Sequence, residues 1–157
     1  MNLAVIEQIL LQSIGAFGGT LGYAVMLNAP ASTVLPASLT GLLGYVIYAV
    51  LFLLTPVGEM SAYFAATVVI AVICELEARR SRMPSTIFLL TALVSLVPGY
   101  TFYCAMLALV EDNSAAFAAY IMEAVQIVAV IAIGAAVTSV LFRTMSELRM
   151  KRKARKA

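Results

Sequence analysis

The chain has 157 residues, of which 63% are hydrophobic and 11% are charged, and its formal net charge is +2. A typical soluble domain has about a quarter of its residues charged and slightly under half of them apolar. A soluble fold of this length could not bury so much apolar surface, so lipid must be the solvent for most of the chain. The composition therefore excludes a soluble enzyme and predicts an all-α integral membrane protein, with residues 1–157 forming a single transmembrane domain.

The residue types present also narrow the chemistry. The chain has no histidine and two cysteines, so a zinc or haem site with the usual ligands is not expected. No nucleophile–base pair, glycine-rich phosphate loop or metal-ligand cluster occurs in the sequence. We therefore expect no cofactor and no enzymatic activity.

Five segments are long and apolar enough to cross a bilayer, which requires about 20 residues per helix. The first lacks the positively charged start of a cleavable signal peptide, because no Lys or Arg precedes residue 79. It is therefore expected to remain as a span. The predicted spans are 9–27, 36–54, 61–76, 85–110 and 115–142, followed by a basic tail over 143–157.

The distribution of charge predicts the orientation of these five spans. All ten Lys and Arg residues lie in 79–82 and 143–157, which fall on one side of a five-span protein, and none falls on the other side. Short cytoplasmic loops carry the excess of basic residues. The sequence therefore predicts an N-terminus outside the cell and a cytoplasmic C-terminus. The basic tail is expected to contact anionic lipid rather than nucleic acid.

The first predicted span carries glycines at helical spacing. Small residues in this pattern let two helices approach closely, which favours a role in helix packing over chemistry. The second span has a weaker version of the same face, with Gly41 and Gly44 beside Tyr45 and Tyr48. The predicted packing residues of the first span are Gly15, Gly18, Gly19 and Gly22.

The fourth predicted span is interrupted by Pro98 and Gly99, within "LVSLVPGYTFYCAM". Proline removes a helical hydrogen bond and glycine is a poor helix former. The break lies roughly 20 Å along the helix from Ser85, a little past the middle of a hydrocarbon core about 30 Å thick. A plain packing kink is one interpretation; a discontinuous helix that binds substrate is the other. On the second, the substrate-binding residues are Ser95, Pro98, Gly99, Tyr100 and Tyr103.

The fifth predicted span contains a carboxylate, Glu123, about eight residues from its start. A charged side chain inside a membrane is costly and usually faces a bundle interior or a wet cavity. Gln126 is three residues further on and is expected to share this face. We predict Glu123 as a proton-coupling residue with Gln126 as its polar neighbour. The alternative is a span that begins nearer Met122, which would leave Glu123 among the lipid headgroups.

The order of these landmarks resembles the C-terminal membrane half of the threonine/serine exporter family. The opening block is "GYAVMLNAPASTVLPASLTGLLGYVIYAVL", a helix, a short Asn/Pro turn and a Gly-rich second helix. The more characteristic block is "LEARRSRMPSTIFLLTALVSLVPGYTFYCAM", with Pro84, the Val97-Pro98-Gly99 triplet and Tyr103. The last helix, with "AIGAAV", also looks like the end of the family pattern. Relatives often carry a further proline at the position of Ser95, so the break is expected to be milder here.

The resemblance implies the smaller subunit of a two-component exporter. Its partner would be a longer chain with a cytoplasmic N-terminal region and five spans, and the two halves would form an inverted repeat. The family is associated with proton-motive-force-dependent export of threonine and serine, and split relatives with dicarboxylates such as succinate. The implied location is a bacterial inner membrane, and a higher oligomer is compatible with it. The alternatives are a scaffold subunit without substrate contacts and a homo-oligomeric channel.

Overall fold

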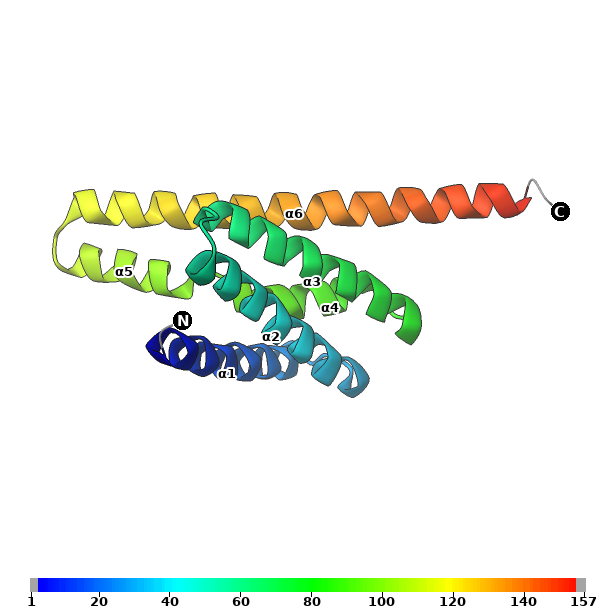
Figure 1. Ribbon diagram of the computed structural model, residues 1–157, viewed down its shortest axis with the longest axis horizontal. Coiled ribbons are helices and arrows are strands. Elements are labelled where there is room, and N and C mark those ends of the chain that lie inside the picture. Colours follow the sequence, from blue (N-terminus) through cyan, green and yellow to red (C-terminus); the bar gives the residue numbers. More distant parts are fainter. Residues whose placement is uncertain (1–2, 155–157) are drawn as a thin grey trace.

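The computed structural model describes residues 3–154, and the chain is helical over nearly all of this range (Figure 1). No strand occurs among these residues, so the predicted all-α fold is confirmed for them. The elements are α1 (Leu3–Met26), α2 (Ala31–Leu54), α3 (Glu59–Ser81), α4 (Ser85–Leu93), the short 3₁₀ helix η1 (Val94–Leu96), α5 (Gly99–Val110) and α6 (Ser114–Ala154).

Four stretches are unbroken helices long and apolar enough to cross a membrane: Ile6–Met26 of α1, α2, α3 and Ser114–Met145 of α6. Between them, Ser85–Leu96 and Gly99–Val110 form a pair bent by 54°, which gives a fifth span if both halves cross together. The predicted interruption at Pro98-Gly99 is therefore confirmed. The count of five spans and the direction in which they run stay predictions from length and charge.

The helix ends differ from the predicted span ends in ways that local chemistry explains. The second helix begins at Ala31 rather than at residue 36, so Pro36 lies inside α2. The helix starts earlier because Pro30 supplies the carbonyl to which both the backbone N–H and the hydroxyl of Thr33 donate. The last helix continues to Ala154, so the predicted basic tail is helical as far as that residue, and residues 155–157 lie outside the described part.

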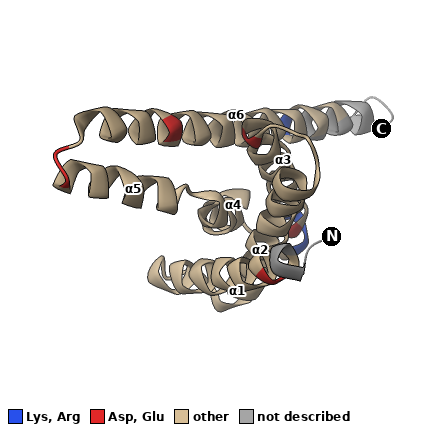
Figure 2. Cartoon of the chain, turned by 60° about the vertical axis from the view of Figure 1, so that its left-hand side comes forward, with Lys and Arg blue, Asp and Glu red and all other residues tan. Residues whose placement is uncertain are grey.

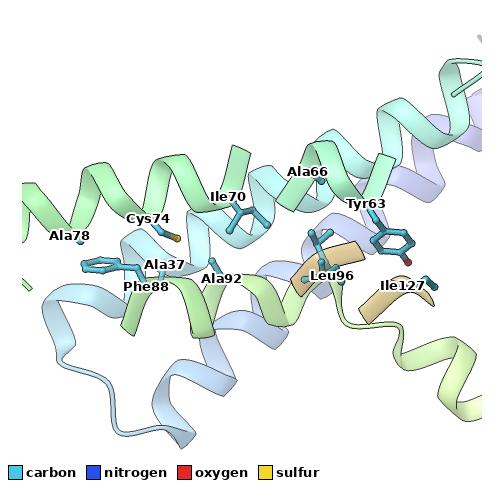
Figure 3. Close-up of a cluster of buried hydrophobic side chains, with 11 residues drawn as sticks. Ala37, Tyr63, Ala66, Ile70, Cys74, Ala78, Phe88, Ala92, Leu96 and Ile127 are labelled. Atoms are coloured by element: carbon cyan, nitrogen blue, oxygen red, sulfur yellow. The ribbon is translucent and has the colours of Figure 1, made fainter. Parts of the chain in front are cut away.

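The bundle is held together by small residues on α2. A Cβ at Gly41 would lie 2.8 Å from Oγ1 of Thr20 and 3.2 Å from the carbonyl oxygen of Ala92, and a Cβ at Gly44 would overlap the Ile70 side chain. These two glycines therefore let α1, α3 and α4 approach α2. The buried apolar cluster around them contains Ala37, Tyr63, Ala66, Ile70, Cys74, Ala78, Phe88, Ala92, Leu96, Ile127 and Ile131 (Figure 3).

The α5–α6 hairpin extends beyond the α1–α4 bundle (Figures 1 and 2). The hairpin turn carries Glu111 and Asp112, and Asn113 starts α6 by accepting the backbone N–H of Ala116 at 3.1 Å. Figure 2 shows the acidic residues of this turn in red, and basic residues in blue on α3 and farther along α6. Arg79, in the last turn of α3, donates to the carbonyl of Phe142 on α6 at 3.5 Å. The contact brings the two predicted basic regions to one end of the molecule.

Candidate functional site

The break between η1 and α5 has a local cause in the backbone. Proline disfavours the helical conformation of the residue before it, and Val97 is extended, with φ −61° and ψ 130°. The chain tightens into η1 before this residue and resumes as α5 at Gly99, whose N–H donates to the carbonyl of Val97 at 2.7 Å. Pro98 itself is buried. The result is a short, irregular backbone segment between two helices.

Ser95 on η1 faces α1 across a groove of about 360 Å³. The serine hydroxyl donates to the carbonyl of Ala92 at 2.9 Å and is partly buried. On the opposite wall, the hydroxyl of Thr20 donates to the carbonyl of Ala16 at 2.6 Å. The groove is lined by Gly15, Ala16, Gly19, Thr20, Gly22, Tyr23, Met26, Val94 and Ser95.

The glycines of α1 were expected to pack against another helix, but they face open space. Nothing lies within 4 Å of a Cβ built on Gly15, Gly18, Gly19 or Gly22, and three of the four line the groove beside the break. No helix of residues 3–154 packs tightly on them. Their predicted role in helix packing remains a prediction and would require a helix from outside the described chain.

A second groove, of about 290 Å³, follows the first along the α1 and α4 side of the bundle. The first groove reaches Met26 and Val94, and the second begins at Leu27 and Thr91. The two grooves therefore lie one after the other between the break and the turn that joins α1 to α2, and together we call them the α1–α4 seam. The second groove is lined by Leu27, Asn28, Ala29, Pro30, Ile87, Leu90 and Thr91.

The structure separates the predicted substrate-binding residues. Ser95 lines the seam, whereas Gly99, Tyr100 and Tyr103 are exposed on α5, the two tyrosines at 80% and 63%. Neither tyrosine lines the groove at Ser95. Sequence reasoning missed Thr20, Tyr23 and Thr91, because hydroxyl groups that face lipid and those that face a groove look alike in a sequence.

Glu123 and Gln126 are also placed differently from one another. Glu123 lies on α6, partly buried, and interacts electrostatically with Tyr63 of α3. It is nine residues from the start of α6 at Ser114, about 14 Å along the helix. Gln126 is exposed, so only Glu123 is turned toward the rest of the bundle.

The long apolar helices are those of a multi-pass membrane protein, and a helix pair interrupted beside a groove is typical of transporters. The model of the family described as Threonine/Serine exporter, ThrE, matches residues 12–141, and the chain belongs to this family. The match includes the break and the whole α1–α4 seam. Neither the curated proteins nor the solved structures contain a match to the chain. The predicted family is thus confirmed, and it is a family of transporters rather than of enzymes.

Proposed function

We propose that this chain is one half of a secondary exporter for small polar metabolites in a bacterial inner membrane, driven by the proton motive force. The observation that supports this most is the interrupted span, whose short 3₁₀ helix borders the α1–α4 seam. Irregular backbone at membrane depth is tolerated only where it is buried in protein or lines a cavity. In transporters such helix breaks bind the solute.

The lining of the seam offers hydrogen-bonding groups for a small polar solute. The hydroxyls of Thr20, Thr91 and Ser95 donate to carbonyls of their own helices at 2.6, 2.8 and 2.9 Å. With their hydrogens used in this way, the hydroxyl oxygens can only accept further bonds. Acceptors suit the ammonium and hydroxyl groups of threonine or serine. A carboxylate group, of an amino acid or of succinate, requires donors, and the Tyr23 hydroxyl and the Asn28 side-chain amide line the seam and can donate.

Uncovered surfaces support a second five-span subunit as partner. The α5 helix packs chiefly against α6 and leaves Tyr100 and Tyr103 exposed. An apolar groove of about 690 Å³ between α1 and α2 contains Ser13, whose buried hydroxyl has no hydrogen-bond partner. A partner of opposite orientation would cover such faces and complete an inverted repeat. Within this assembly Glu123 serves as the proton-coupling carboxylate.

Export of threonine from cells that express this chain together with the five-span partner tests the proposal. Pro98→Ala with Gly99→Leu should straighten the fourth span, close the solute path and abolish export while the protein remains in the membrane. Thr144→Ala is the control. The Thr144 hydroxyl donates to the carbonyl of Val140 on its own helix, as the seam hydroxyls do on theirs, but Thr144 is exposed on α6. Unchanged export in the double variant would overturn the assignment of the path.

The scaffold alternative has support of its own, since the hydroxyls of Thr20, Thr91 and Ser95 already have partners within their own helices. A photoreactive threonine analogue separates the two functions. Labelling of this chain supports the path proposed here, and labelling of the partner alone supports a scaffold. Purification of a functional assembly without a five-span partner would instead support a homo-oligomeric channel.

A further inference from the structure

A row of aromatic and carboxylate side chains crosses the bundle near the end at which α3 begins. The Tyr45 hydroxyl of α2 donates to the amide oxygen of Gln12 at 2.6 Å, and the rings of Tyr45 and Tyr48 lie 6.0 Å apart. Tyr48 donates to Glu59 at 3.3 Å and stacks on Tyr63 with ring centroids 4.2 Å apart. The transport path described above uses none of these residues.

Glu59 occupies the outer end of this row. It is the first residue of α3 and is partly exposed, so it is accessible from the surface. A carboxylate at a helix N-terminus is stabilised by the positive end of the helix dipole. The Tyr48 hydroxyl adds a long hydrogen bond, at 3.3 Å. This carboxylate is therefore held in place while it remains open to protons from the surface.

Tyr63 connects the row to α6. The residue is only 8% exposed, and Figure 3 shows its ring extending from α3 toward Ile127. Ile127 is four residues after Glu123, so the two lie on one face of α6. Glu59, four residues before Tyr63, shares its face of α3. The buried tyrosine thus lies where α3, which begins with Glu59, packs against α6, which carries Glu123.

The row also adjoins the break in the fourth span. Leu96, the last residue of η1, belongs to the same buried cluster as Tyr63 and Ile127 (Figure 3). Glu123 precedes Ile127 of this cluster by about one turn of α6. The basic residues closest in sequence to Glu59 and Glu123 are Arg79 and Arg143, which lie toward the far ends of α3 and α6.

We propose that Glu59 is a second proton-binding carboxylate, from which protons reach Glu123 by way of the hydroxyls of Tyr48 and Tyr63. In one transfer the Glu59 carboxyl loses a proton and the Glu123 carboxylate gains one. Each tyrosine hydroxyl accepts one proton and gives one up, so both phenols are unchanged. This inference rests on the proposed function and adds an entry route for the coupling ion.

The experiment measures two fluxes in vesicles that contain the full chain and its partner subunit. The first is threonine flux driven by a pH gradient, and the second is exchange of labelled for unlabelled threonine without a gradient. Glu59→Gln and Tyr63→Phe should lower gradient-driven flux by about tenfold or more and leave exchange within about twofold of wild type. Tyr48→Phe, which keeps the stacked ring, should lower gradient-driven flux in the same way.

Glu111→Gln in the α5–α6 turn and Tyr120→Phe on α6 are matched controls and should change neither flux. Full gradient-driven flux in Glu59→Gln or in Tyr48→Phe would overturn the relay. Equal loss of both fluxes would show a structural role and overturn it as well. If wild type shows neither flux, the proposed function fails, and that outcome is distinct from failure of the relay.

Discussion

Gly44 lies where α2 crosses α3, and a methyl group at this position would overlap the side chain of Ile70. Ile70 is fully buried and cannot move aside into solvent or lipid. Overpacking of this kind costs about 1–3 kcal/mol. We therefore expect Gly44→Ala to lower the free energy of unfolding by that amount, measured by thermal or denaturant unfolding of the purified chain in detergent.

The matched control for this prediction is Gly22→Ala, because no atom lies within 4 Å of a Cβ at Gly22. This change should leave the free energy of unfolding unchanged or raise it by up to about 1 kcal/mol, because alanine is the better helix former. Equal destabilisation by both substitutions would show that α1 packs as tightly as α2 does, contrary to the structure.

The two glycine patterns also show what a sequence can predict about single residues. Spacing places glycines on one face of a helix, and that was predicted for both α1 and α2. It does not say which helix, if any, lies opposite that face. The stronger pattern, at Gly15, Gly18, Gly19 and Gly22, is uncovered within the described chain, whereas the weaker pair, Gly41 and Gly44, makes the close approaches.

At the scale of the element, two residues cause the break between η1 and α5. Pro98 forces Val97 out of the helical conformation, and Gly99 offers little resistance to the bend. Pro98→Ala with Gly99→Leu should therefore restore one continuous helix and remove the 54° bend. Spin labels at Leu90 and Leu107, both exposed, can report the bend as a distance between the two helices, in a chain without its native cysteines.

A continuous helix would hold these two Cα positions about 26 Å apart, for 17 residues at 1.5 Å each. We expect the label separation to lengthen toward this value in the double variant. A separation unchanged from that of the chain with Pro98 and Gly99 would show that tertiary packing, and not these two residues, causes the bend.

The elements were largely predictable because apolar length and helix-breaking residues are local signals. The break at Pro98-Gly99 was located from two letters of the sequence. The helix ends were less predictable, since apolarity marks the lipid-facing part of a helix and not the helix itself. For this reason α2 begins before Pro36 and α6 continues through the basic tail to Ala154.

At the scale of the molecule, the arrangement of the helices decides which polar groups meet. Ser95 and Thr20 lie on different helices, 75 positions apart in the chain, yet both line the groove beside the break. Tyr100 and Tyr103 follow Ser95 closely in sequence but lie on another face. The bend between η1 and α5 separates them, and no sequence pattern specifies the direction of that bend.

The measurement that bears most directly on the account is substrate protection of Ser95. In a chain with Cys74 and Cys104 replaced by alanine, Ser95→Cys should react with a small hydrophilic thiol reagent, and saturating threonine should slow that reaction. Val97→Cys is the control, because Val97 is exposed and does not line the groove. The account predicts protection at position 95 and none at position 97. A thiol at position 95 that threonine leaves equally reactive would contradict it.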